Sequence, residues 1–201
     1  MSVMAGVGRG AKEGVLIKNA EVLEVMEKVD TIVVDKTGTL TQGRPEVTAI
    51  ETFGEWNQSH VLTLAAAVEA QSEHPLAEAV VRRAKADRLQ VAEAVDFASI
   101  TGGGVRAQVD DHDVLIGNAD LLDEKYVANL DAGRSQARSH QAEGATVVFV
   151  SIDKQLAAIL AITDPIKEST PSALKTLHEL CLLYTSPSPR DLSTSSMPPS
   201  A

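Results

Sequence analysis

The fold is decided by the stretch Thr31-Ile32-Val33-Val34-Asp35-Lys36-Thr37-Gly38-Thr39-Leu40-Thr41. It opens with a continuous apolar run, which is typical of a strand buried on both faces inside a parallel sheet. Asp35 follows this run directly, at the carboxyl end of the strand, where open α/β sheets bind their ligands. Gly38 and Gly43 then break the chain. The stretch therefore predicts an α/β domain with a carboxylate at its ligand-binding edge.

The residues of this stretch suit phosphoryl transfer. Asp35 can attack a phosphoryl group and form an aspartyl phosphate. The Gly and Thr residues that follow offer N–H groups and hydroxyls to phosphate oxygens, and Lys36 adds a positive charge. Such chemistry needs Mg²⁺, which prefers hard oxygen ligands such as the Asp35 carboxylate. The alternative is a solvated turn after a strand, but seven specified residues in this context favour a functional motif.

Outward from this stretch, the pattern changes at Pro45 and changes back near Thr163. Between them, residues 45–162 are expected to form an α+β unit inserted after the Asp35 strand. Strands are predicted at 47–52, 97–100, 105–109, 114–116, 146–152 and 156–162, and helices at 60–70, 76–88 and 130–141. Asp153-Lys154 is predicted to be the turn of a hairpin.

Two flanking segments belong to the first domain, and the C-terminal segment stands apart. Residues 1–44, with a helix predicted at 20–28, lead into the Asp35 strand, and residues 163–180 return to the same domain with a helix at 168–180. Residues 181–201 are rich in Ser and Pro and have no periodicity. This tail is expected to be disordered and to be a non-native, vector-derived sequence, because such a composition cannot bury a core.

The composition excludes several classes of function. The formal net charge of -10 argues against a nucleic-acid partner, which needs clustered Lys and Arg. A single cysteine, Cys181, rules out an internal disulfide. No stretch reaches the roughly 18 apolar residues of a membrane helix, and the N-terminus lacks the apolar core of a signal peptide.

The segment Asp35–Thr41 resembles the phosphorylation signature of P-type ATPases, and the resemblance runs from about Met1 to Leu180. It implies an α/β fold: a partial haloacid-dehalogenase-like phosphorylation domain with a parallel sheet, split by an inserted α+β nucleotide-binding domain with an antiparallel sheet. It also implies ATP and Mg²⁺ as cofactors, with Asp35, Lys36 and Thr37 as catalytic residues. Asp35 and the Thr37 carbonyl would form part of the Mg²⁺ site.

The segment Ser72-Glu73-His74-Pro75-Leu76 resembles a signature of the heavy-metal-transporting branch of that family. The resemblance implies that His74 and Glu69 contact the adenine of ATP. A neutral imidazole can stack on a purine or form a hydrogen bond with it. The alternative for His74 is an ordinary residue at the start of a helix.

Two further segments resemble nucleotide contacts of the same branch. Thr101-Gly102-Gly103-Gly104-Val105 is similar to its Gly-x-Gly loop, with Gly102 and Gly104 at the glycine positions and Thr101 where the family has Pro. Glycine allows close approach of the backbone to a ligand, and the alternative is a tight turn. Asn118 matches a position that contacts the nucleotide, and its alternative is a helix N-cap.

The resemblance also bears on the transported ion. Residues Met1–Glu24 look like the exit from a metal-binding membrane helix of copper-type pumps, which favours Cu(I) or Ag(I) over Zn(II). The chain would then be a fragment lying at the cytoplasmic face of a membrane, a bacterial plasma membrane, with the actuator and membrane domains of the same pump as partners. The remaining histidines, His60, His112, His140 and His178, show no ligand spacing and are expected at the surface.

Two other functions compete with the pump. Soluble phosphatases of the haloacid-dehalogenase type carry a second Asp two residues after the nucleophile as general acid and base, and this chain has Thr37 there. The loss of that acid should slow hydrolysis of the phosphoenzyme, which suits a pump that changes shape before it releases phosphate. The other rival is a non-catalytic nucleotide-binding module. The segment Asp164–Lys167 is expected to re-enter the phosphorylation domain, without a catalytic role for Lys167.

Overall fold

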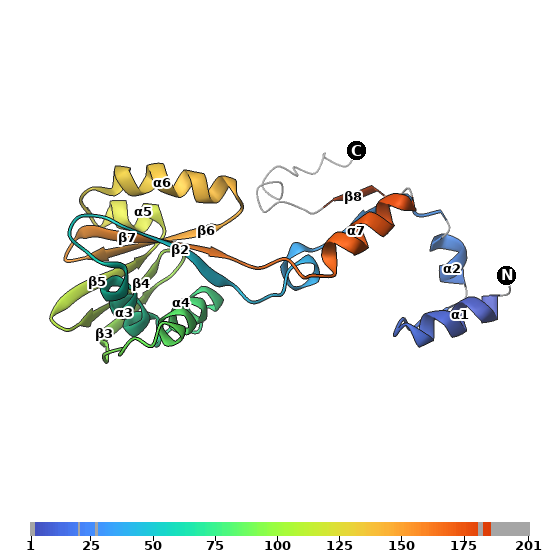
Figure 1. Ribbon diagram of the computed structural model, residues 1–201, viewed down its shortest axis with the longest axis horizontal. Coiled ribbons are helices and arrows are strands. Elements are labelled where there is room, and N and C mark those ends of the chain that lie inside the picture. The colour runs from blue at the N-terminus through green and yellow to red at the C-terminus, as the bar shows by residue number, and fades with distance from the viewer. Residues whose placement is uncertain (1–2, 20, 27, 181–182, 186–201) are drawn as a thin grey trace, which may run out of the picture. The chain divides into compact units, whose positions relative to one another are not determined.

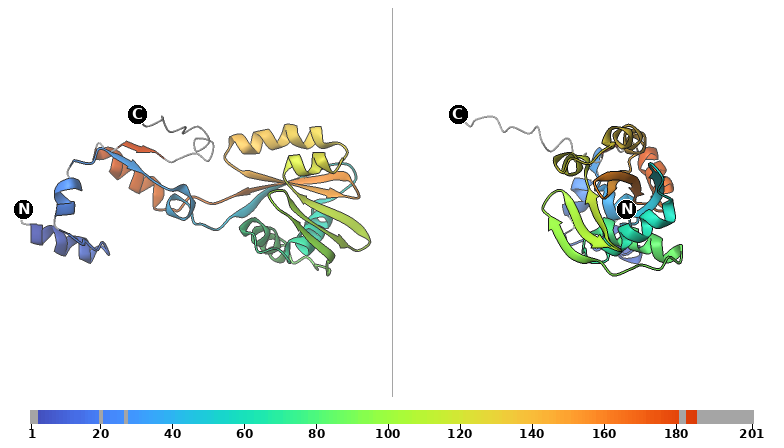
Figure 2. Two further views of the ribbon diagram at one scale, coloured as in Figure 1. Left: turned by 180° about the vertical axis from the view of Figure 1, so that it is seen from behind. Right: turned by 90° about the vertical axis from the view of Figure 1, so that its left-hand side faces the viewer.

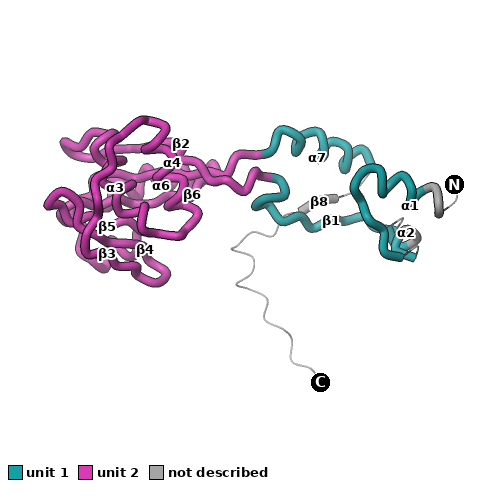
Figure 3. The backbone as a smooth tube through the Cα atoms, turned by 90° about the horizontal axis from the view of Figure 1, so that it is seen from below, with its two compact units in different colours: residues 1–40, 167–201 teal, residues 41–166 magenta. Residues whose placement is uncertain are grey.

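The computed structural model describes residues 3–19, 21–26, 28–180 and 183–185. It divides into two compact units, of which unit 1 comprises residues 1–40 and 167–201 and unit 2 residues 41–166 (Figure 3). Unit 2 thus extends slightly beyond the predicted limits of 45 and 162, because Thr41 bridges to Ile166 and draws both connecting segments into it. Among the described residues, no helix is long and apolar enough to cross a bilayer.

Unit 2 is built on a six-stranded antiparallel sheet. In spatial order its strands are β2 (Glu46–Thr52), β7 (Gln155–Thr163), β6 (Thr146–Ile152), β5 (His112–Gly117), β4 (Gly104–Val109) and β3 (Val95–Ile100). The hairpin predicted at Asp153-Lys154 is confirmed, since Ile152 pairs with Gln155 across a two-residue turn. Both turn residues have positive φ, 49° and 61°, which matches the twist of the strands that they join.

Two pairs of helices cover the two faces of this sheet (Figure 1). The pairs are α3 (Gln58–Glu69) with α4 (Pro75–Ala86), and α5 (Ala119–Glu124) with α6 (Leu130–Ala142). Figure 2 shows the same three layers from behind. Alternation along β5 separates two cores, because Val114 and Ile116 pack under α3 and α4 whereas Leu115 packs under α5 and α6. The predicted antiparallel α+β unit is therefore confirmed.

Unit 1 contains short elements around the Asp35 stretch. They are α1 (Val3–Lys12), α2 (Glu21–Met26), β1 (Thr31–Val33), α7 (Thr170–Glu179) and β8 (Leu183–Thr185). β1 pairs in parallel with β8, with Thr31 opposite Leu183. The predicted parallel pairing is confirmed, but the prediction of a strand buried on both faces is wrong, because Val33 is 67% exposed. Within the described residues β8 is the one strand that pairs with β1.

The C-terminal tail also differs from its prediction. Residues 181–201 are expected to be disordered, yet Leu183–Thr185 forms β8. Residues 181–182 and 186–201 lie outside the described residues. Two helices were not predicted. α1 lies in a glycine-rich segment of low helix propensity, and α5 is short.

Candidate functional site

A pocket of about 420 Å³ opens at one end of the sheet of unit 2. Its walls come from the end of α3, the α3–α4 connection, the β3–β4 turn and the adjoining ends of β5 and β6. All five residues that the sequence proposes as nucleotide contacts line it: Glu69, His74, Gly102, Gly104 and Asn118. Its size falls within the range of small-molecule sites, and the fold brings together residues that lie far apart in the sequence.

His74 is the N-cap of α4. Its Nδ1 accepts a hydrogen bond from the Leu76 N–H at 3.2 Å, and its own N–H donates to Ser72 Oγ at 3.3 Å. The alternative of a helix-start residue is therefore confirmed as the local role of His74. That role also has a consequence for binding. Because Nδ1 acts as an acceptor, the neutral ring carries its proton on Nε2, which can then donate to a ring nitrogen of a purine.

Glu69 is the last residue of α3, and its side chain is almost fully buried at the pocket wall, with 8% exposed. Burial raises the pKa of this carboxyl from 4.5 to about 7. The cause is desolvation, which disfavours the charged form. A strongly shifted carboxyl in a pocket is typical of a functional site.

The glycine loop owes its composition to two different constraints. Gly102 has a φ of +72°, which a residue with a side chain adopts only with strain. At Gly104 a Cβ would lie 1.9 Å from the Ile116 carbonyl oxygen and 2.6 Å from the Gly117 Cα. The sequence suggested that glycine here allows the backbone to approach a ligand, but at Gly104 the backbone that approaches closely is that of the neighbouring strand β5. Because the loop carries no side chains between β4 and β5, its backbone forms one wall of the pocket.

Asn118 joins the glycine loop to α5. Its Oδ1 accepts from the Leu121 N–H at 2.8 Å, so the predicted alternative of a helix N-cap is confirmed. Its Nδ2 donates to the Gly102 carbonyl at 3.0 Å, and its backbone N–H donates to the Gly103 carbonyl at 3.0 Å. Asn118 thus holds the loop in place from the floor of the pocket.

In unit 1, Asp35 lies exposed two residues beyond the end of β1. It is followed by an irregular helical turn, Lys36–Leu40, in which Gly38 has a φ of 77°. The turn is held from the opposite segment of the same unit. Lys167 Nζ donates to the Gly38 carbonyl at 2.5 Å, and Thr170 Oγ1 donates to the Leu40 carbonyl at 2.7 Å. Lys167 therefore positions the turn after Asp35, a role that the sequence did not indicate.

The donor set near Asp35 suits Mg²⁺ only in part. The Asp35 carboxylate and the Thr37 carbonyl are hard oxygen donors, and Mg²⁺ commonly takes one or two protein carboxylates together with water and phosphate oxygens. No cluster of three or more His, Cys, Asp or Glu side chains that could hold a metal occurs in the part of the chain that the structure describes. The residues present therefore fit Mg²⁺ as a partial site that phosphate oxygens and water would complete.

Comparison with known proteins identifies the family. A model of haloacid dehalogenase-like hydrolases matches residues 29–193. The chain belongs to this family. It is 49% identical over 89% of its length to a copper-exporting P-type ATPase of Legionella pneumophila, and 45% identical over 89% to a silver-exporting P-type ATPase of Salmonella typhimurium. It spans about a quarter of the length of these relatives, 24% and 22%.

A solved structure also relates this haloacid dehalogenase-like chain to metal-transporting P-type ATPases. The crystal structure of a zinc-transporting PIB-type ATPase in its E2.Pi state matches 95% of the chain and 31% of that protein, with 34% identity and a TM-score of 0.78. The predicted resemblance to heavy-metal-transporting P-type ATPases is thereby confirmed, as is the predicted fold class. The chain is homologous to these pumps over nine-tenths of its length.

Two side-chain clusters of this family member were not predicted. Asp164 accepts hydrogen bonds from Thr41 Oγ1 at 2.5 Å, from the Gly43 N–H at 3.1 Å and from the Arg44 N–H at 3.0 Å, so its carboxylate fastens the two connecting segments together. The sequence signal that could have indicated this cluster is the pair Asp164-Pro165, which is typical of a turn. In the other cluster His60 stacks on Trp56, with ring centroids 5.5 Å apart, and His112 meets both rings edge-on.

Proposed function

We propose that this chain carries the ATP-binding and phosphorylation steps of a P-type ATPase that exports a soft metal cation, Cu(I) or Ag(I). The observation that carries the proposal is the pocket of unit 2, which gathers Glu69, His74, Gly102, Gly104 and Asn118. Unit 1 adds Asp35 on a braced turn. Relatives named as copper- and silver-exporting ATPases support the choice of ion.

In this proposal the pocket binds the adenine end of ATP. The Nε2–H of His74 donates to a ring nitrogen, and the Glu69 carboxylate accepts from the 6-amino group. Gly102 and Gly104 give the base a wall without side chains, and Asn118 keeps that wall in position. Affinity is expected to be on the order of 0.1 to 1 mM, because these few polar contacts leave the phosphates largely in solvent.

The chemical step belongs to Asp35. A carboxylate oxygen attacks the γ-phosphorus, a new O–P bond forms, and the bond from that phosphorus to the β–γ bridging oxygen breaks, so that ADP leaves with the electron pair. Lys36 and the N–H groups of the following turn stabilise the charge on the phosphoryl oxygens. Mg²⁺, held in part by Asp35 and the Thr37 carbonyl, would neutralise phosphate charge. Thr37 supplies no general acid for rapid hydrolysis of the aspartyl phosphate.

The remaining parts of the proposal concern the whole pump. The exported cation would be bound by membrane helices, and the actuator and membrane domains of the same protein would be the partners of this chain. Its place would then be the cytoplasmic face of a membrane, where ATP is available. These expectations rest on relatives of which the chain spans about a quarter.

An NMR titration of the full chain with ATP tests the binding site. We expect shifts at His74, Gly102 and Asn118, and about tenfold weaker binding for His74→Ala. His60→Ala is the matched control, because His60 is also an exposed imidazole at the start of a helix but does not line the pocket. Equal loss of affinity in both variants, or an absence of shifts around the pocket, would remove the proposed nucleotide site.

The phosphorylation step is tested in the pump that contains this chain. With γ-labelled ATP, Asp35→Asn should lose the acid-stable phosphoenzyme entirely while ATP binding is retained, because the two groups of residues lie in different units. Asp30→Asn serves as the control, since that carboxylate precedes β1. A label that survives in Asp35→Asn would contradict the role of Asp35.

A further inference from the structure

The Glu69 carboxyl has no bonding partner within the described residues, although the side chain is 8% exposed. None of the hydrogen bonds or ion pairs among these residues involves its oxygens. No fully enclosed side-chain oxygen or nitrogen in the described part of the chain lacks a partner. The carboxyl oxygens are therefore not fully enclosed, and Glu69 lines the pocket without a hydrogen bond from its carboxyl to another described residue.

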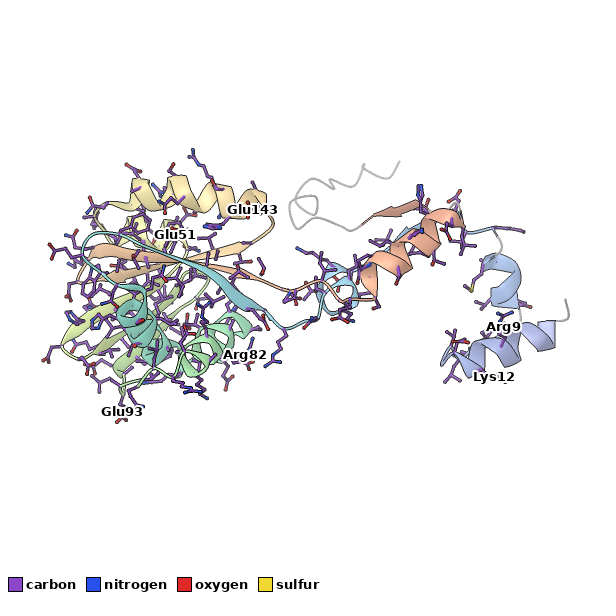
Figure 4. The ribbon with its side chains drawn as sticks, viewed as in Figure 1. Arg9, Lys12, Glu51, Arg82, Glu93 and Glu143 are labelled. Atoms are coloured by element: carbon purple, nitrogen blue, oxygen red, sulfur yellow. The ribbon has the colours of Figure 1, made fainter. Side chains whose placement is uncertain are left out.

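The charged groups around Glu69 do not neutralise it. The β3–β4 turn and the lining residues of β5 and β6 contribute no titratable side chain to the pocket. Ser72 and His74 lie on the α3–α4 connection, and His74 Nδ1 is already bound to a backbone N–H. α4 contributes Glu78, Arg82 and Lys85 to a second cavity that Glu69 also lines. Of these, Arg82, which is labelled in Figure 4, donates to the Pro45 carbonyl and pairs with Glu78.

Desolvation is accordingly the cause of the raised pKa of Glu69, about 7, and nearby charges do not offset it. In the empty pocket at neutral pH, the protonated and ionised forms of this side chain are therefore about equally populated. A ligand that favours one form must displace this balance and must exchange protons with the solvent.

Adenine limits which form it can favour. Its 6-amino group is the one part of the base that donates N–H hydrogen bonds. A protonated carboxyl can accept such a bond through its carbonyl oxygen, but the ionised carboxylate accepts a stronger one, because hydrogen bonds to a charged acceptor are roughly twice as strong as neutral ones. The Nε2–H of His74 is a donor that matches the acceptor nitrogens of the ring. An acceptor at position 69 and a donor at position 74 therefore complement the base without any further protein group.

We propose that Glu69 couples nucleotide binding to proton release: the empty pocket holds a partly protonated carboxyl, and an adenine nucleotide binds the carboxylate through its 6-amino group. This inference rests on the proposed function and adds a regulatory property to the same site. The proton leaves to the buffer, and the N–H···O hydrogen bond replaces the O–H bond that held it. Affinity for ATP then rises with pH and weakens at acidic pH.

Calorimetry of the full chain with ATP, in buffers of different ionisation enthalpy, measures the proton count directly. At pH 7 we expect release of about half a proton per ATP from Glu69. The dissociation constant should fall about tenfold between pH 6 and pH 8, because the ionised fraction of a group with a pKa of about 7 rises about tenfold across that range.

Two controls separate the Glu69 carboxyl from the other groups of the complex that can exchange protons, namely the His74 imidazole and the ATP phosphates. Glu69→Gln keeps both and removes the carboxyl, so the proton release due to Glu69 should disappear. An ATP analogue with unsubstituted purine as its base keeps the phosphates and lacks the 6-amino group, and it should bind without releasing that half proton. A ¹³C NMR titration of the native Glu69 carboxyl provides a measurement that needs no variant, and its midpoint should fall when ATP is bound.

The outcomes separate the two proposals. If ATP does not bind at any pH, both the nucleotide site and the proton coupling fail. If ATP binds, but with proton uptake, or with the same proton count and pH profile in Glu69→Gln as in the native chain, the nucleotide site stands and the coupling is refuted. Release that is lost in Glu69→Gln and with the unsubstituted-purine analogue supports the coupling.

Discussion

The two units of this protein are stabilised in different ways. In unit 2, both faces of the sheet are covered by helices, and two cores of fully buried apolar side chains result. In unit 1, among the residues whose burial is described, the one buried side chain is that of Thr170, whose hydroxyl bonds to the turn after Asp35. The pocket of unit 2 is therefore built on packing, whereas the turn after Asp35 in unit 1 is held by a few hydrogen bonds.

This difference indicates what each site requires. Burial at the pocket wall raises the pKa of Glu69 and so keeps its carboxyl partly protonated. Such a pKa shift needs a rigid apolar surrounding. Asp35 is exposed, and its turn is positioned by Lys167 and Thr170 at its backbone carbonyls. Exposure leaves the Asp35 carboxyl accessible to the phosphoryl group that the proposed function assigns to it. Substitutions should therefore have large effects on folding in unit 2 and small, local effects in unit 1.

The largest effect is expected at Gly104. Gly104→Ala places a Cβ against the Ile116 carbonyl, and neither backbone can move without disrupting the sheet. We expect a loss of about 3 kcal/mol or more in unfolding free energy. Gly102→Ala is the matched control, because its Cβ would meet nothing within 4 Å and only its positive φ is strained, at a cost of about 1 to 2 kcal/mol.

Urea denaturation followed by the fluorescence of Trp56, the one tryptophan of the chain, measures both variants in unit 2. If Gly102→Ala is as destabilising as Gly104→Ala, then close packing of β4 on β5 is not what requires glycine in this loop.

Sequence reasoning anticipated the unit with the extensive core better than the other. Strand alternation and hairpin turns such as Asp153-Lys154 are local signals, so the antiparallel sheet could be predicted. The pocket residues could be found from the sequence because His74 lies in a recognisable motif, Ser72–Leu76, and Glu69 stands at a fixed spacing before it. The burial that raises the pKa of Glu69 could not, because it depends on packing between segments that are distant in sequence.

Unit 1 was harder to predict for a physical reason. β8 is three residues long and lies in a segment without periodicity, so only its pairing with β1 identifies it. The contact between Lys167 and the Gly38 carbonyl joins residues separated by the whole of unit 2. The stacking of His60 on Trp56 beside His112 is likewise a product of tertiary structure, which ligand spacing in the sequence could not indicate.

The next largest effect concerns the pH dependence of unit 2 in the absence of nucleotide. The pKa of Glu69 is about 7 in the native state and 4.5 when unfolded, so the native state holds its proton more tightly. Relative to high pH, protonation of Glu69 stabilises the native state; this stabilisation is complete below pH 4.5 and is lost as the pH rises through about 7. At pH 8 the ionised carboxylate costs about 3 kcal/mol.

Glu69→Gln should therefore raise the unfolding free energy at pH 8 by up to about 3 kcal/mol more than it does at pH 4.5. Denaturation at both pH values measures the difference, and Glu93→Gln, at an exposed position labelled in Figure 4, should show almost none. A Glu69→Gln effect of the same size at both pH values would contradict the raised pKa.

A smaller effect is expected in unit 1. Thr170→Val preserves the shape of the side chain and removes its hydrogen bond to the Leu40 carbonyl, at a cost of about 1 kcal/mol. Hydrogen exchange of the Lys36–Leu40 amides should become about fivefold faster, whereas the Trp56 transition of unit 2 should not move. Thr176→Val is the control on the same helix, because Thr176 bonds only within α7. Equal acceleration in both variants would show that Thr170 does not brace the turn.

The smallest effect tests whether surface charges add to the stability of unit 2. Arg106 donates to both Asp113 oxygens, at 2.6 and 3.0 Å, across the β4–β5 hairpin, and the pair raises the pKa of Arg106. The Arg106 side chain is 55% exposed, so water and salt screen most of the attraction. A double-mutant cycle with Arg106→Gln and Asp113→Asn should give a coupling free energy of about 0.5 kcal/mol or less. This coupling should decrease further in 1 M salt, where the Debye length is about 3 Å, roughly a tenth of its value at 0.01 M. A coupling above about 1.5 kcal/mol would mean that this hairpin, which shapes the glycine wall of the pocket, depends on its ion pair as well as on the packing of Gly104 against β5.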